Sequence, residues 1–257
     1  GIFVLIALLM VLDIFLVWIE RKVVSRFQDR IGPNRVGPFG LIQPFADIIK
    51  LLIKEDITPA GADKVVYNLA PILSMMSVLI LWAIVPLAPV ILGVDLNVGA
   101  LYLVAAGAIG TLSIIMAGWS SNNKFALIGA FRQVAVMVSF EIPMVAMLLI
   151  PTIFAGTMGI NGIIQKQDTW FFILSPLGAI IFLIAAIAEL GRAPFDMAEG
   201  ESELVSGYNI EYAGMKFGMF YAGELLHAFT FGGFWAIMFF GGYRFFGLEK
   251  VSPFLAV

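Results

Sequence analysis

The chain contains no cysteine and only one histidine, His227. Without thiols it can form no disulfide and ligate no iron–sulfur cluster, and a single imidazole argues strongly against a histidine-built metal centre. A glycine-rich phosphate loop between a strand and a helix is also missing, since the glycines are scattered through apolar stretches. Charged residues are scarce, at 13% of the chain. The sequence therefore predicts no metal site, no redox cofactor held by this chain and no nucleic-acid partner.

Apolar residues are abundant instead, at 61% of the chain, with a mean hydropathy of +0.99. Globular domains have about 45–50%. The excess is gathered into runs of about 20 residues, the length that crosses a bilayer as a helix. We expect an all-α fold, a polytopic bundle of transmembrane helices that forms one domain over residues 1–257. The six expected spans are approximately 1–19, 68–92, 100–120, 129–155, 170–190 and 216–241.

Residues 20–67 form a long polar connection that carries eight Lys or Arg residues. Two Gly-Pro pairs, Gly32-Pro33 and Gly37-Pro38, interrupt regular structure in it. Residues 41–54 then show one apolar and one polar face, which predicts an amphipathic helix in the membrane interface or over a cavity between spans. A lipid-surface helix without a further role is an equal alternative. The alternation of loops puts twelve basic residues on this side and three on the other, so this side is expected to be cytoplasmic.

An acidic loop, residues 191–215, follows the fifth run. The stretch from Glu189 to Tyr212 holds six acids and one base, Arg192. If residues 198–206 are helical, Asp196, Glu199 and Glu203 share one face at i, i+3 and i+7. Like charges so placed repel one another, which makes a proton easier to hold. A solvated acidic loop is the alternative.

Four acids lie in or at the edge of the expected spans: Asp13, Glu141, Glu189 and Glu224. Acids in such positions usually face protein or water and mark ion pathways or proton relays. We interpret these four as a relay that continues into the acidic loop. The alternative is local pairing, for instance of Glu224 with His227 one turn further along the helix.

Two long motifs carry a resemblance to a known family. Residues 28–56 read QDRIGPNRVGPFGLIQPFADIIKLLIKED, and residues 188–212 read AELGRAPFDMAEGESELVSGYNIEY. Together with Glu20-Arg21-Lys22, they closely resemble the H-subunit family of proton-pumping NADH-quinone oxidoreductase, which includes the first membrane subunit of mitochondrial complex I. The similarity runs along the whole chain, although Gly191 stands where the family often has Asn or Glu. The family usually has eight spans, so we expect one or two of them to lie beyond this chain.

The resemblance implies a membrane subunit that forms the quinone-binding channel at the junction with the hydrophilic arm. Such a subunit couples quinone reduction to proton translocation, while the redox centres belong to partner subunits. By match of motif, the residues expected at the quinone channel are Arg21, Arg30, Phe45, Asp47, Phe195 and Asp196. The residues expected in proton coupling are Glu141, Glu189, Glu199, Glu201, Glu203, Glu211 and Glu224.

The resemblance also implies ubiquinone or menaquinone as substrate, and the other complex I subunits and the lipid bilayer as partners. The expected location is a bacterial cytoplasmic membrane, with the mitochondrial inner membrane or the thylakoid as alternatives. An equivalent subunit of a membrane-bound hydrogenase or of a ferredoxin- or F420-linked dehydrogenase is the nearest alternative function. A stand-alone proton-coupled transporter is a different class, against which the missing inverted repeat argues. An inert anchor would tolerate neutralisation of Glu141 or Glu189.

Overall fold

The structure is a computed structural model that describes residues 2–86, 94–196 and 201–244, without the side chains of residues 2–5, 201 and 202. Every regular element in these ranges is a helix, which confirms the predicted all-α fold. The long helices are α1 (Ile2–Phe27), α3 (Lys64–Leu81), α4 (Gly99–Ser120), α5 (Lys124–Ala155), α8 (Pro176–Glu189) and α10 (Gly214–Phe240). The short ones are η1 (Pro38–Gly40), α2 (Gln43–Ile53), η2 (Trp82–Ile84), α6 (Ile160–Gln165), α7 (Phe171–Leu174), α9 (Glu201–Leu204) and η3 (Gly207–Asn209).

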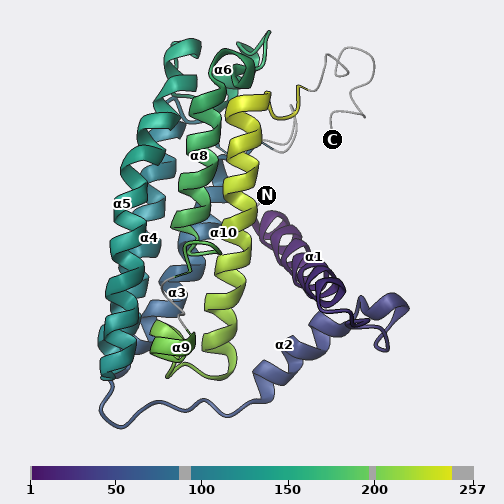
Figure 1. The fold of residues 1–257 in the computed structure, drawn as a ribbon, viewed down its shortest axis with the longest axis vertical. Helices are drawn as coiled ribbons and strands as arrows, with labels where there is room; N and C mark the ends of the chain where they lie inside the picture. Colours follow the sequence, from purple (N-terminus) through teal and green to yellow (C-terminus); the bar gives the residue numbers. More distant parts are fainter. Residues whose placement is uncertain (1, 87–93, 197–200, 245–257) are drawn as a thin grey trace.

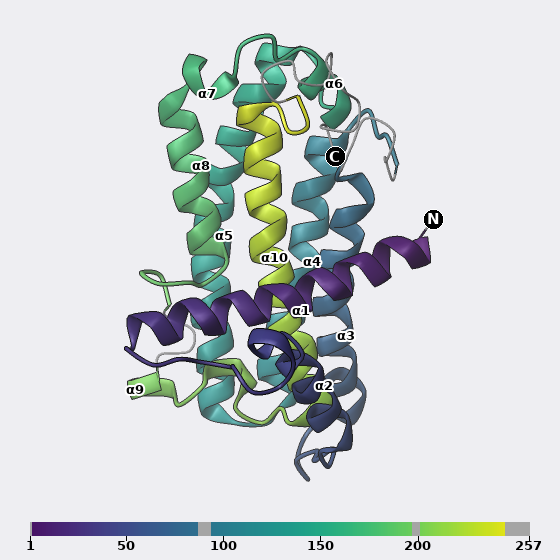
Figure 2. The same cartoon turned by 90° about the vertical axis from the view of Figure 1, so that its right-hand side faces the viewer.

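Helices α3, α4, α5, α8 and α10 stand side by side as a bundle, and α1 crosses this bundle obliquely on its outside (Figures 1 and 2). α1 contacts both α2 and α10, and α2 contacts α10. The two N-terminal helices therefore cover one side of the bundle, near the end at which α9 lies. α6 lies at the opposite end (Figure 1).

Four stretches of the described residues are long and apolar enough to cross a membrane: Lys64–Ile84, Gly99–Ser120, Lys124–Ala155 and Gly214–Phe240. α8 is apolar but shorter. Large apolar side chains such as Ile142 and Ile153 of α5 are exposed on the bundle surface, as expected for helices that face lipid. The fold is that of a polytopic helical membrane protein, and the number of six spans stays a prediction.

Helix boundaries differ by more than two residues from four of the expected spans, one of which is 129–155, where α5 already starts at Lys124. α1 continues beyond residue 19 to Phe27, so Glu20 and Arg21 lie on a helix and the polar connection begins after them. For the expected span 68–92, α3 starts earlier, at Lys64, and is followed by η2. Residues 87–93 of this span lie outside the described residues. The expected span 170–190 is divided into α7 and α8 at Ser175, because the residue before a proline disfavours helical backbone.

The helix considered for residues 198–206 of the acidic loop ends before residue 206, at Leu204. Within the proposed helix 198–206, the structure has only α9, and residues 198–200 lie outside the described ranges. Val205 follows α9 with a φ of 68°, a left-handed conformation that stops a helix. The expected amphipathic helix at 41–54 is present as α2, and its position in the membrane interface stays a prediction.

Close glycine contacts bring the segment after α9 into the bundle. A Cβ on Gly129 of α5 would sit 2.6 Å from the Cα of Gly207, so the two backbones touch there. Small residues allow such an approach between packed segments. As a result η3 lies against α5, and both Tyr208 and Asn209 are buried.

Two stacked tyrosines fix the start of α10 to α3. The rings of Tyr67 and Tyr212 lie 4.2 Å apart at their centroids, and the Tyr67 hydroxyl donates to the Glu211 carbonyl at 2.7 Å. Burial raises the pKa of Tyr212 to about 12, so its phenol stays protonated and donates to the Tyr67 carbonyl at 3.2 Å. Lys216 pairs with Asp56 at 2.8 Å, which ties the connection after α2 to α10.

Candidate functional site

An outer cavity of about 390 Å³ lies between α1, α2 and α10. Most of its wall is apolar, and each of the three helices α1, α2 and α10 contributes at least one polar side chain to it. Asp13 is buried in this wall, with its Oδ1 atom shielded from solvent and without a hydrogen-bond partner among the described residues. The cavity is lined by Asp13, Ile14, Val17, Arg21, Pro44, Asp47, Ile48, Lys50, Leu51, Phe217, Gly218, Tyr221 and Ala222.

A neighbouring cavity of about 500 Å³ shares Arg21 and Tyr221 with the outer cavity. Its wall is more polar and includes Glu20 and Arg30. The two cavities therefore adjoin along one turn of α1 and one position of α10. The remaining lining residues are Val24, Gly32, Pro33 and Gln43.

The Gly-Pro segment folds α2 back onto α1, so that α2 supplies part of the wall of these cavities. Gly40 has a φ of 78°, and a Cβ there would lie 2.3 Å from the Pro33 carbonyl oxygen, so the turn requires glycine. The Trp18 indole donates to the Phe39 carbonyl at 3.2 Å. Arg21 of α1 forms an ion pair with Asp47 of α2. These contacts hold α2 across α1 and α10 as one wall of the outer cavity.

An inner cavity of about 40 Å³ lies inside the bundle and is lined by polar side chains from several helices. Glu189, at the end of α8, is only 5% exposed. Three buried atoms around this cavity have no hydrogen-bond partner among the described residues: Glu189 Oε2, Gln133 Oε1 and His227 Nε2. Buried polar atoms are usually satisfied by water where protein partners are missing, and a cavity of this size holds about two or three waters. The polar residues of the wall are Ser74, Ser77, Gln133, Glu189, Tyr208, Glu224 and His227.

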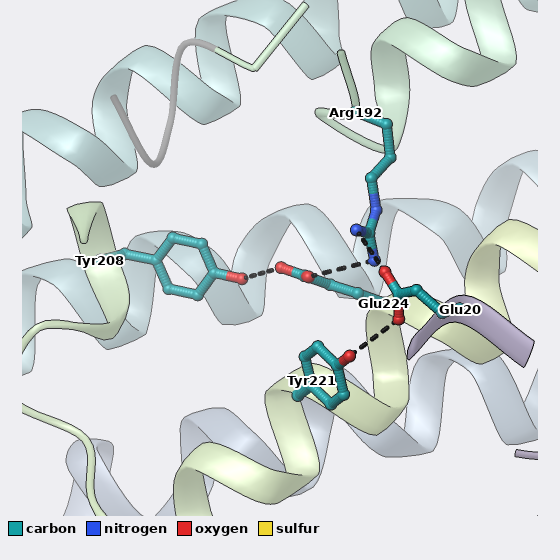
Figure 3. A network of polar contacts seen from close by, with 5 residues as sticks. All are labelled: Glu20, Arg192, Tyr208, Tyr221 and Glu224. Carbon is teal, nitrogen blue, oxygen red and sulfur yellow. Dashed lines mark hydrogen bonds and ion pairs between the residues drawn. The ribbon is translucent and has the colours of Figure 1, made fainter. Parts of the chain in front are cut away.

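A network of polar contacts around Arg192 joins residues that line the neighbouring cavity to residues that line the inner cavity (Figure 3). Arg192 Nη1 lies 3.3 Å from Glu20 of α1, and its Nη2 lies 4.0 Å from Glu224 of α10. The Tyr221 hydroxyl donates to Glu20 at 2.8 Å, and the Tyr208 hydroxyl donates to Glu224 at 2.8 Å. Glu20 and Tyr221 line the neighbouring cavity, whereas Tyr208 and Glu224 line the inner one. We call these five residues the arginine network.

The residues predicted for the quinone channel fall into two groups. Arg21, Arg30 and Asp47 line the two cavities beside α1. Phe45 is exposed on α2 and is not among the lining residues of the described cavities. Phe195 packs against Phe140 of α5, with ring centroids 5.2 Å apart, and Asp196 is exposed. The structure thus brings Arg21, Arg30 and Asp47 together around these two cavities. Phe45, Phe195 and Asp196 are not among the residues that line them.

The predicted coupling acids also separate. Glu189 and Glu224 share the inner cavity, whereas Glu141 lies on α5 and is not among the residues that line it. Glu203 is exposed and pairs with Arg132 at 2.6 Å, while Glu211 accepts a hydrogen bond from Asn123 at 2.7 Å. Two further acids were predicted on the loop: Glu199, which lies outside the described residues, and Glu201, which begins α9 with its side chain outside the description.

Several residues of the site escaped the sequence reasoning. Glu20 and Arg192 belong to the recognised motifs, and the isolation of Arg192 among acids was a usable signal. The sequence gives no comparable signal for Tyr208 and Tyr221, because helix packing determines their hydrogen-bond partners. The proposed pairing of Glu224 with His227 does not describe the site, since Glu224 contacts Tyr208 and Arg192, and the His227 ring stacks on Phe231 at 4.7 Å.

The apolar helices and the enclosed polar groups define the class: a polytopic membrane protein with ionisable residues inside its bundle. The family model described as NADH dehydrogenase matches residues 1–256, and the chain belongs to that family. The family expected from the two motifs is thereby confirmed.

Curated relatives from different bacteria agree with this family, and each is named as the H subunit of an NADH-quinone oxidoreductase. The chain is 47% identical over 228 residues to the relative from Dehalococcoides mccartyi strain CBDB1, a match that covers 89% of this chain and 65% of that relative. It is 45% identical over 231 residues to the relative from Rhodospirillum rubrum, covering 89% and 68%. It is 43% identical over 241 residues to a relative from Geobacter metallireducens, covering 90% and 73%. The chain thus spans roughly two thirds of the length of these relatives.

Proposed function

We propose that this chain works as the membrane subunit of a proton-translocating NADH:quinone oxidoreductase, in which it forms the quinone channel and takes part in proton coupling. The names of its relatives support the assignment to an NADH-quinone oxidoreductase. The observation that carries the channel is the outer cavity of about 390 Å³ between α1, α2 and α10. Its apolar wall suits the isoprenoid tail of a quinone, because apolar ligands are held mainly by burial in apolar pockets. The ion pair Arg21–Asp47 then marks a polar position beside the tail.

Proton coupling is assigned to the inner cavity and the acids around it. Glu189 and Glu224 face a space that can hold water, and Glu141 of α5 is the third acid assigned to coupling. Buried carboxylates joined by water or hydroxyl groups can take up and pass on protons. The proposal places the redox centres in partner subunits, because this chain offers no cysteine for a cluster. It also places the complex in an energy-coupling membrane.

The coupling role can be tested on the assembled complex in sealed vesicles with Glu189→Gln. Glutamine keeps the size of the side chain but cannot carry a proton, so we expect both quinone reduction and proton uptake to fall severalfold. The matched control is Asp95→Asn, an exposed acid at the α6 end of the bundle, which should leave both rates at the wild-type level. Unchanged rates for Glu189→Gln in a fully assembled complex would reduce the proposal to a channel without a proton role.

A further inference from the structure

Arg192 occupies a position that the fold defines closely. It follows α8 directly after Gly191, which turns the chain with a φ of 63°. A Cβ on Gly191 would lie 2.7 Å from the Gln133 side chain, so the turn packs tightly against α5. The guanidinium of Arg192 thereby reaches both Glu20 of α1 and Glu224 of α10 (Figure 3), which line the neighbouring cavity and the inner cavity respectively.

The two acids that face Arg192 have similar surroundings: each accepts a hydrogen bond from a tyrosine on one oxygen and faces the guanidinium with the other. One oxygen of Glu20 accepts a hydrogen bond from Tyr221, and its other oxygen faces Arg192 Nη1 at 3.3 Å. One oxygen of Glu224 accepts from Tyr208, and its other oxygen faces Arg192 Nη2 at 4.0 Å. Nη2 is buried and makes no hydrogen bond within the described residues. A single cation is thus placed between two competing carboxylates and is nearer to Glu20.

We propose that Arg192 is a positioning residue that exchanges its ion pair between Glu20 and Glu224. Neutralisation of Glu20 weakens its attraction for the guanidinium, and the side chain then closes the longer distance to Glu224. A change of charge on the wall of the neighbouring cavity is thereby transmitted to the wall of the inner cavity. The inference rests on the proposed function, because it assigns quinone chemistry to the cavities beside α1 and proton handling to the inner cavity.

Other charged and titratable groups frame this exchange. On the outer side, Arg21 and Tyr221 lie beside Glu20 in the wall of the neighbouring cavity. On the inner side, Glu189, His227 and Tyr208 share a cavity with Glu224. The guanidinium of Arg192 faces both Glu20 and Glu224. An arginine with two alternative carboxylate partners is a two-state element. Its position therefore changes the electrostatic environment of Glu20 and of Glu224 at the same time.

The test compares the number of protons translocated per quinone reduced by the assembled complex in sealed vesicles. Arg192→Gln should lower this ratio by roughly twofold or more, the effect expected when a coupling residue is lost. Arg192→Lys should restore much of the ratio, since lysine keeps the charge but not the forked geometry. Glu20→Gln should lower the ratio as well. The double variant Glu20→Gln/Arg192→Gln should have a ratio no lower than that of Arg192→Gln, because both substitutions remove the same contact between Arg192 and Glu20.

Arg132 provides a matched control. It too forms an ion pair with a glutamate, Glu203, and its side chain is 41% exposed against 40% for Arg192. A merely structural arginine predicts equal effects of Arg132→Gln and Arg192→Gln on the ratio, and that result would overturn the inference. So would a wild-type ratio in Arg192→Gln. If Arg192→Gln does not assemble, Glu20→Gln decides the question in the same way, because it leaves the arginine in place.

The failure of the inference is distinguishable from the failure of the proposed function. A wild-type complex that reduces no quinone would remove the proposed function and the inference with it. A coupled wild-type complex whose Arg192 and Glu20 variants stay fully coupled would remove only the inference.

Discussion

Acids that look alike in the sequence have different surroundings in the fold. Glu203 and Glu211 are engaged at the rim of the bundle, by Arg132 and Asn123 respectively. Glu189 instead has a buried oxygen without a protein partner among the described residues and faces the inner cavity. The energetic cost of burying a carboxylate is high unless it is paired. A buried acid that is not fully paired is therefore better explained by function than by stability.

Asp13 offers the same argument at the outer cavity. Its Oδ1 atom is buried without a hydrogen bond to any described residue, a situation that typically costs about 1–3 kcal/mol. We expect Asp13→Leu to raise the free energy of unfolding by about 1 kcal/mol or more, because it removes this unsatisfied group. The same change should slow quinone reduction, because the wall of the outer cavity loses its carboxylate. Thermal unfolding and steady-state activity of the complex measure the two effects.

Asp13→Asn is the matched variant, since it keeps a polar side chain of the same size. Its free energy of unfolding should stay close to that of the wild type. Its activity should lie between those of the wild type and Asp13→Leu. A destabilised but fully active Asp13→Leu variant would show that Asp13 contributes to folding and has no part in the channel.

At the scale of elements, α2 acts as a wall that is attached at both of its ends. The turn before α2 is held to α1 by Trp18 and Phe39, and Arg21 pairs with Asp47 within the helix. The connection after α2 is held to α10 by Lys216 and Asp56. The shape of the outer cavity therefore depends on how closely α10 approaches α2.

Gly218 of α10 is the residue at which this approach can be changed. It lines the outer cavity, and a Cβ there would lie 3.0 Å from the Leu51 Cδ1 atom of α2. Gly218→Val should therefore narrow the cavity and push Leu51 inward. We expect a rise in KM of several-fold for a quinone with a long isoprenoid tail, and a smaller rise for a short-chain analogue. Steady-state kinetics with the two substrates measure this difference.

Gly232→Val is the control on the same helix, because a Cβ at Gly232 meets no atom within 4 Å. It carries the same change in helix propensity without touching the cavity, and it should leave both KM values unchanged. Equal effects of the two valine variants, or an equal rise for both quinones, would contradict a tail-binding role for the outer cavity.

At the scale of the whole molecule, the sequence predicts what the bilayer imposes and misses what packing decides. The all-α bundle follows from apolar runs of membrane-spanning length. The meeting of Arg21, Arg30 and Asp47 follows from the Gly-Pro turn that folds α2 back. Tyr221 lies 201 residues from its partner Glu20, a contact that appears only once α1 crosses α10.

The same limit explains why Phe195 lies apart from the cavities. Phe195 belongs to the acidic motif, and its neighbourhood in the sequence indicated the quinone channel. In the fold, the chain turns after α8, and the ring packs on Phe140 of α5 instead. Motif membership shows that residues belong to one family pattern, whereas the helix packing decides which of them share a cavity.

The N-terminal unit formed by α1 and α2 is attached to the bundle mainly along α10, whereas α4 lies between α3 and α5 with extensive contacts to both. Segments with fewer buried contacts open more easily than the core. Hydrogen–deuterium exchange of the complex should therefore be faster in α2 than in α4. Asp47→Asn removes the ion pair to Arg21, so it should accelerate exchange over residues 43–53 and leave residues 99–120 unchanged. An equal acceleration in both helices would mean that α2 opens only together with the bundle, and a wall that cannot open separately could not admit a quinone from the side of α2.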